Sequence, residues 1–137
     1  MRRSLPRGYE LDDDHGRIDF DAVHAYVGGE SYWAKGRTRA RMQAAIDGSA
    51  RVIGLYAPDG SQAGFARVIS DRATYAYLAD LYVLEQHRGR GLGFELVREA
   101  VEGEPWARLS WHLHTRDAQS LYAKFGFGPA SERSLER

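Results

Sequence analysis

The sequence has no cysteine, no net charge and no long apolar segment, and each of these absences excludes a class of protein. A chain without cysteine has no disulfide framework, no thiolate metal site and no thiolate nucleophile. Lysine plus arginine and aspartate plus glutamate both number 19, so the formal net charge is zero. A general nucleic-acid or anionic-membrane binder needs a positive surface, and none is expected here. No apolar run approaches the roughly 20 residues of a membrane helix, and no signal-peptide segment is evident, so we expect a cytoplasmic protein.

The composition is that of one ordinary globular domain. Hydrophobic residues make up 43% and charged residues 28% of the 137 residues, which is enough for a single core. No internal repeat, low-complexity tract or linker divides the chain. We therefore expect one domain over residues 1–137.

Turn and capping residues mark the elements of the first third of the chain. A short strand is predicted at Tyr9–Asp13. Asp19 can cap a helix that ends by Gly28-Gly29, because a side-chain oxygen at this position accepts from the first free N–H groups. Thr38 can cap a second helix that runs to Asp47.

From residue 51 the pattern changes to that of strands. Turn residues at 58–61 predict a hairpin, and alternating apolar side chains continue beyond it. The predicted elements are strands Arg51–Ala57, Gln62–Ser70 and Thr74–Val83, a helix Gly91–Glu102, a strand Trp106–Thr115, and a short helix Ala118–Phe125 that Asp117 can cap. The order β-α-α-β-β-β-α-β-α predicts an α+β fold, in which a meander is followed by a crossover helix between two parallel strands.

The segment that precedes the helix Gly91–Glu102 is rich in glycine. Gly89, Gly91 and Gly93 allow the backbone to turn so that several N–H groups point into one concavity. The helix N-terminus adds unpaired N–H groups and the positive end of a dipole, and Arg88 and Arg90 add charge. The segment therefore suits a pyrophosphate; the alternative is a tight solvated turn without a ligand.

Two nucleotide-binding motifs do not fit this loop. A P-loop needs Gly-Lys-Ser/Thr at the start of the helix, and Gly93-Phe94-Glu95 stands there. A dinucleotide-binding fingerprint needs a small residue three places after Gly93, and Leu96 occupies that place. It also needs an early βαβ unit, whereas this loop follows a meander.

With these residues the sequence closely resembles the GCN5-related N-acetyltransferase (GNAT) superfamily. Arg88-Gly89-Arg90-Gly91-Leu92-Gly93 matches the family signature Gln/Arg-x-x-Gly-x-Gly/Ala in full. A second segment, Ala118–Phe127, resembles the family motif A-x-x-L-Y-x-K-x-G-F at the expected distance. The resemblance covers residues 9–127. It implies a twisted, mostly antiparallel mixed sheet with helices on both faces and a splayed central pair of parallel strands.

The resemblance implies acetyl-CoA as the co-substrate and assigns its contacts. Backbone N–H groups of Arg88–Gly93 would bind the pyrophosphate. Leu81, Tyr82 and Val83 resemble the strand that holds the acetyl and pantetheine groups through backbone contacts. Thr115 stands where the family often has asparagine, and its hydroxyl can still donate one hydrogen bond. The family's last strand would be short, absent or supplied by the partner in a homodimer.

The residues favour direct attack by a bound amine in a ternary complex, because no cysteine is present to form an acyl-enzyme. The N–H of Val83 would face the oxyanion, and Tyr122 matches the tyrosine that protonates the leaving thiolate in many family members. Asp80 is the candidate base for the amine, with a water path or a structural role at the strand end as alternatives. His112 and His114 share a strand face without a third ligand, so no metal is expected.

The sequence therefore predicts an N-acetyltransferase whose acceptor is a small molecule with a primary amine. Tyr32, Trp33 and Tyr77 suit an amine pocket through packing and cation–π contacts. The alternative for Tyr32 and Trp33 is that they close the edge of the core. Zero net charge argues against nucleic acid as a partner. Two other functions stay open at this point: acetylation of a protein amine, and acyl-CoA sensing without turnover.

Overall fold

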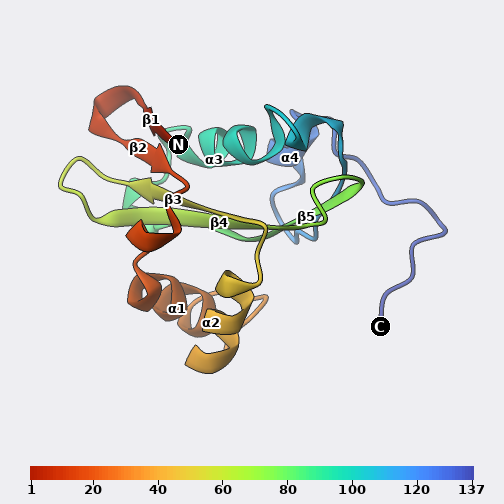
Figure 1. The fold of residues 1–137 in the computed structure, drawn as a ribbon, viewed down its shortest axis with the longest axis horizontal. Coiled ribbons are helices and arrows are strands. Elements are labelled where there is room, and N and C mark those ends of the chain that lie inside the picture. Colours follow the sequence, from red (N-terminus) through yellow and green to blue (C-terminus); the bar gives the residue numbers. More distant parts are fainter.

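A six-stranded sheet forms the middle of the fold, and the strands lie in the sheet in sequence order (Figure 1). The computed structural model describes residues 1–137. Neighbouring strands are antiparallel except for the last pair, β5 and β6, which is parallel. The strands are β1 (Arg2–Ser4), β2 (Glu10–Asp12), β3 (Arg51–Tyr56), β4 (Gln62–Ser70), β5 (Tyr75–Val83) and β6 (Ser110–His112).

Helices α1 and α2 cover one face of the sheet, and α3 and α4 cover the other (Figure 1). The predicted caps of the first two helices are confirmed: the Asp19 carboxylate accepts from the N–H of Ala22, and the Thr38 hydroxyl accepts from that of Arg41. The α-helices are α1 (Phe20–Gly29), α2 (Arg39–Asp47), α3 (Leu92–Val101) and α4 (Gln119–Ala123). Single 3₁₀ turns lie at Pro6–Gly8, His15–Arg17, Glu85–His87 and Trp106–Arg108.

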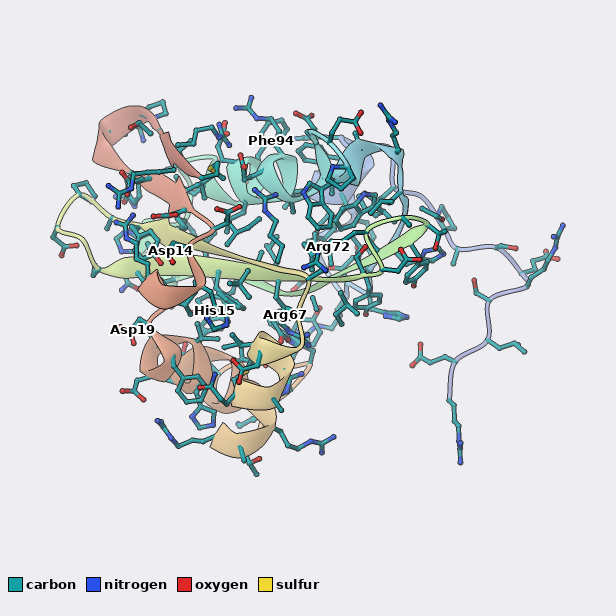
Figure 2. The ribbon with its side chains drawn as sticks, in the orientation of Figure 1. Asp14, His15, Asp19, Arg67, Arg72 and Phe94 are labelled. Carbon is teal, nitrogen blue, oxygen red and sulfur yellow. The ribbon has the colours of Figure 1, made fainter.

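The alternation of side chains along the strands separates two apolar cores. Phe65 and Tyr82 belong to a cluster of 7 buried residues with α1 and α2, whereas Ala66 and Val68 belong to a cluster of 18 that includes α3. Arg67 shares the face of Phe65, so its side chain lies on the side of α1 and α2 (Figure 2). The sheet therefore carries a buried arginine into this layer.

Strand β5 contains a bulge at Asp80, where its register against β4 shifts. The shift falls between Phe65 and Arg67 of β4. Asp80 has a φ of +53°, in the left-handed region that is uncommon for residues other than glycine. Gly64 is required nearby, because a Cβ at this position would lie 2.6 Å from the carbonyl oxygen of Tyr82. The pairing of β5 with β6 ends at Tyr77, so at the bulge and beyond it β5 has β4 as its only neighbour.

The strand predicted at Trp106–Thr115 is shorter in the structure, where it covers Ser110–His112. Trp106–Arg108 forms a 3₁₀ turn, and only Ser110–His112 pairs with β5, at Tyr75–Tyr77. An edge strand has hydrogen bonds on one side only, so it ends where its partner diverges. The parallel pair is splayed as expected, but it lies at the edge of the sheet rather than at its centre, because no strand follows β6 in the sheet order.

Two local details also differ from the sequence prediction. Strand β1 was not predicted, because three residues with two arginines show no apolar alternation; it pairs with β2 as a hairpin. Asp117 does not cap the last helix. Instead the Thr115 hydroxyl accepts from the N–H of Ala118 at 3.1 Å, while Asp117 is exposed.

The rest of the chain adds no further sheet or helix. No strand follows α4, and residues 128–137 form a tail without helix or strand (Figure 1), from which Glu136 contacts Nε2 of His114 at 3.1 Å. None of the helices has both the length and the apolar character that a membrane crossing requires. No group of three or more His, Asp or Glu side chains is arranged to hold a metal ion.

Candidate active site

A cleft of about 810 Å³ opens where β5 and β6 diverge. Its walls come from both faces of the sheet: Arg67 and Tyr77 on the side of α1 and α2, and Leu92 and Leu121 on the side of α3 and α4. The cleft therefore runs along the edge of β5 and is open to both faces of the sheet. Ligands that enter from opposite faces would meet at the same stretch of backbone.

The glycine-rich loop forms one end of the cleft and presents a row of free backbone donors. Gly89 and Gly91 have φ values of +79° and +73°, and α3 begins directly after Gly91. The N–H groups from Gly89 to Phe94 donate to no atom of the chain. A Cβ at Gly89 or Gly91 would meet nothing within 4 Å. Free N–H groups at the positive end of a helix dipole form a site for an anion.

Arg88 joins this loop to the end of β5 and to α1. Its Nε donates to the carbonyl oxygen of Val83 at 2.9 Å, and its Nη2 donates to the Tyr26 hydroxyl at 3.0 Å. The Tyr26 ring in turn stacks on Tyr82, with ring centroids 4.1 Å apart. These contacts fix the position of the glycine-rich loop relative to the end of β5.

Beyond the bulge, the open side of β5 offers backbone donors to the cleft. The N–H of Leu84 donates to the carbonyl of Ala63 on β4 at 2.8 Å. Because successive peptide groups of a strand point to opposite sides, the N–H groups of Leu81 and Val83 point away from β4. No strand pairs with β5 on that side at these residues. Two free donors therefore lie along the cleft.

Tyr122 reaches the cleft from α4. Its ring is buried and packs edge-on against Phe127, with centroids 5.9 Å apart. Its hydroxyl makes no hydrogen bond within the chain and is not sealed inside, since the buried side-chain polar atoms without a partner are Gln62 Nε2 and His112 Nδ1. Burial raises the pKa of Tyr122 to about 12. The phenol is therefore protonated at neutral pH and free to donate.

Comparison with known proteins decides the family. The family model for the acetyltransferase (GNAT) domain matches residues 49–129, which is more than half of the chain. The chain belongs to the GNAT family of acetyltransferases. This confirms the family that the two sequence motifs predicted.

Relatives of this GNAT chain share its fold over most of their length. A structure from Xanthomonas campestris pv. campestris, described as an acetyltransferase of the GNAT family, is 38% identical with a TM-score of 0.87, over 98% of this chain and 94% of that one. A Gibberella zeae protein described as an acetyltransferase is 25% identical, over 85% of this chain and 76% of its own length. A structure from Deinococcus radiodurans R1 is 22% identical with a TM-score of 0.73, over 100% of this chain and 94% of that one, a likeness of fold alone.

In this GNAT chain, Asp80 lies at the centre of a buried ion-pair network. Its Oδ2 accepts from Nη1 of Arg37 at 2.6 Å and from Nε of Arg67 at 2.7 Å, and its Oδ1 accepts from Nε1 of Trp33 at 2.8 Å. Burial raises the pKa of the Asp80 carboxyl, but the charge of Arg67 and the three hydrogen bonds outweigh it and hold this pKa below its ordinary value. A carboxylate held in this way is a weak base, so these contacts favour a structural role. The assignment of Asp80 as the base stays a prediction.

The predicted acceptor residues line the α1/α2 side of the GNAT cleft. The side chains of Tyr32 and Trp33 meet edge to face, with ring centroids 5.2 Å apart. The Tyr32 hydroxyl accepts from the N–H of Arg116 at 2.9 Å, and the Tyr77 hydroxyl contacts Nδ1 of His114. These contacts join the α1–α2 loop and β5 to the segment after β6.

The structure brings nearly all of the predicted site residues to this one cleft. Arg90 is the exception: it is exposed, donates to the carbonyl of Gln86 at 2.8 Å, and lies outside the cleft. The predicted residues that line the cleft are Tyr32, Trp33, Tyr77, Asp80, Leu81, Tyr82, Val83, Arg88, Gly89, Gly91, Leu92, Gly93, Thr115 and Tyr122. Their position is established by the structure, and their roles stay predictions.

Arg67 is a cleft residue that the sequence analysis missed. Its side chain is 11% exposed and forms an ion pair with Asp80. A signal for it exists in the sequence, because a charged residue at an otherwise apolar strand position needs a buried partner. Asp80, in the middle of the next strand, is the carboxylate that this signal would have matched.

Proposed function

We propose that the protein transfers the acetyl group of acetyl-CoA to the primary amine of a small molecule, by direct attack within a ternary complex. The observation that carries this proposal is the cleft that passes the open edge of β5. A loop suited to a pyrophosphate lies at one end, aromatic side chains lie at the other, and the free N–H groups of Leu81 and Val83 lie between them. Positioning two reactants at one backbone segment supplies most of the rate of such a transfer.

The residues of the chain have separate tasks in this reaction. The loop Gly89–Phe94 binds the pyrophosphate, and the edge of β5 aligns the extended pantetheine arm. The N–H of Val83 donates to the thioester carbonyl oxygen and stabilises the negative charge that develops there. The amine nitrogen bonds to the carbonyl carbon and the carbon–sulfur bond breaks. The sulfur takes a proton from Tyr122, which regains one from solvent, and the nitrogen releases a proton to water.

Water is the proposed acceptor of the amine proton, because the bases near the acceptor residues already have partners. The Asp80 carboxylate is held by two arginines and an indole N–H. The ring nitrogens of His114 contact the Tyr77 hydroxyl and the Glu136 carboxylate.

This proton path predicts the pH dependence of the reaction. For an alkylamine with a pKa of about 10.4, the neutral fraction rises about tenfold per pH unit below that value, so kcat/KM for the amine should rise steadily. Tyr122, with its pKa raised to about 12, keeps its proton throughout and should add no descending limb. The measurement is thiol release at pH 6.5–9.5, with circular dichroism as the control for folding. A fall in kcat/KM above pH 8 in a folded sample would contradict this assignment.

The cofactor assignment is tested by thermal unfolding. A ligand present at about 100 times its Kd stabilises the folded state by about 2.7 kcal/mol, which is a rise in Tm on the order of 10 °C for a chain of this size. Acetyl-CoA should produce this rise, ADP a part of it, and adenosine, which has no phosphate, almost none. An unchanged Tm in excess acetyl-CoA would overturn the assignment.

The acceptor class is tested by free-thiol release with a panel of small amines and of peptides. Release that is stimulated by small amines supports the proposal. Release on peptides or proteins alone would support a protein amine as the acceptor. Binding of acetyl-CoA without stimulated release on either would support an acyl-CoA sensor.

A further inference from the structure

The ion-pair network at Asp80 contains more positive than negative charge. Arg67 and Arg37 both contact one oxygen of the Asp80 carboxylate, and neither forms an ion pair with another carboxylate. Two cations and one anion give this network a net charge of +1. The side chains of Asp80, Arg67 and Arg37 are 2%, 11% and 23% exposed, so bulk water screens this charge only in part. A buried charge of this kind calls for a counter-ion.

The guanidinium groups still have donors without a partner in the chain. Arg67 uses Nε for Asp80 and Nη1 for a long contact of 3.5 Å to the Ser49 hydroxyl, and its Nη2 has no partner in the chain. Arg37 uses only Nη1, for Asp80 and for the sulfur of Met42. None of the remaining donors is sealed in the interior. Both arginines line the cleft, on the side of the sheet where Figure 2 shows Arg67, so these donors are available to a ligand bound there.

We propose that the acceptor carries a carboxylate as well as its amine, and that Arg67 and Arg37 bind this carboxylate. The inference rests on the proposed transfer to a small amine. A carboxylate brings one negative charge, which balances the net charge of the network, and its planar oxygens match the donors of a guanidinium group. A phosphate dianion would leave an excess negative charge beside Asp80.

The position of the arginines favours an amino acid over a longer amine with a distant carboxylate. Asp80, which holds both guanidinium groups, is followed directly by Leu81, whose N–H lies on the open edge of β5. The point of attack at the N–H of Val83 lies two residues further along this edge, about 7 Å away, so a carboxylate bound at the arginines lies within the length of one small molecule of it. In an α-amino acid the amine and the carboxylate share one carbon, so both groups can be placed together.

The surroundings of the arginines indicate an apolar side chain on this amino acid. Tyr32, Trp33 and Ile69 line the same side of the cleft and are 45%, 39% and 43% exposed. Tyr77 faces Ile69 across β4 and β5. An apolar or aromatic substituent would cover this exposed surface, with the charged groups held at the arginines.

The first test compares amines that differ only at the carboxylate. L-phenylalanine, L-phenylalaninamide and 2-phenylethylamine are each assayed with acetyl-CoA by thiol release. Phenylalanine should have a kcat/KM about ten- to a hundredfold higher than the other two, the loss expected for a charge-assisted hydrogen bond. The amide has the less basic amine and hence the larger neutral fraction, so amine basicity cannot produce the preference for phenylalanine over the amide. Equal values for all three would overturn the inference, and a preference for phosphoethanolamine over phenylalanine would assign the arginines to phosphate instead.

The second test changes the arginine. Arg67→Gln should reduce the preference for phenylalanine over phenylalaninamide about tenfold, with Arg37 still present, and Arg67→Lys, which keeps the charge without the planar donors, should give an intermediate value. Arg41→Gln, an exposed position of α2 outside the cleft, is the matched control and should keep the preference. The Tm shift with acetyl-CoA confirms that each variant is folded. A preference that is unchanged by Arg67→Gln in a folded protein would overturn the inference.

Failure of the inference can be told apart from failure of the proposed function. Thiol release that is stimulated equally by charged and uncharged amines overturns the carboxylate site alone. If no amine stimulates release, the proposed function fails, and binding of phenylalanine to the CoA complex is then measured by calorimetry. Binding that is lost in Arg67→Gln supports the carboxylate site in that case, and absence of binding overturns it.

Discussion

Replacing Gly91 with valine is expected to abolish binding of acetyl-CoA. The residue has a φ of +73° directly before the first turn of α3, it lines the cleft, and a Cβ there would meet nothing within 4 Å. A branched side chain would keep the phosphates from the free N–H groups. Loss of two charge-assisted hydrogen bonds, each worth about 1.5–3 kcal/mol, lowers affinity about 100-fold or more. Calorimetry with CoA measures this effect.

The control must separate the loss of contacts from backbone strain. Gly60, in the turn between β3 and β4, has a φ of +88° and also has nothing within 4 Å of an added Cβ. Gly60→Val should therefore cost a similar strain, about 1–2 kcal/mol, without weakening CoA binding. Arg90→Ala should have a small effect, because Arg90 lies outside the cleft. Similar, small losses in Gly91→Val and Arg90→Ala would show that the loop is only a turn.

Replacing Tyr122 with phenylalanine is expected to lower kcat by about 10²–10⁴-fold, the usual contribution of a general acid. The KM for acetyl-CoA should change little. The ring would still pack against Phe127, and the removed hydroxyl has no partner in the chain, so the Tm should also stay nearly constant. Steady-state kinetics at saturating amine measures the change. A kcat equal to that of the unmodified protein would assign the proton to water and leave Tyr122 a packing role.

A second tyrosine provides the matched control for this variant. Burial also raises the pKa of Tyr56 to about 12, but its hydroxyl donates to the carbonyl of Arg17 at 3.1 Å, away from the cleft. Tyr56→Phe should therefore lower the Tm through the lost hydrogen bond and leave kcat unchanged. A comparable loss of kcat in both variants would indicate a general effect on the fold rather than the loss of a proton donor.

Local signals predicted the elements of this protein where their cause is local. Asp19 and Thr38 cap their helices because a side-chain oxygen meets an N–H three residues away. The glycine-rich loop was predicted from a local cause as well, because two of its glycines adopt the left-handed conformation that glycine favours. The length of β6 depends instead on how far β5 stays within reach, so the predicted strand Trp106–Thr115 was too long. The bulge at Asp80 is likewise a property of two strands together.

The sequence by itself determined the family, the order of the elements from β2 onward and the loop that carries the free N–H groups, because motif spacing and helix capping act over a few residues. The tertiary structure decided the state of Asp80. It placed Arg37, Arg67 and Trp33, from two other segments, around the carboxylate of Asp80. These contacts favour a structural role for this candidate base. The tertiary structure also decided that the ion-pair network at Asp80 has two cations and one anion, because burial and pairing depend on which strands and loops meet, and no local pattern records that.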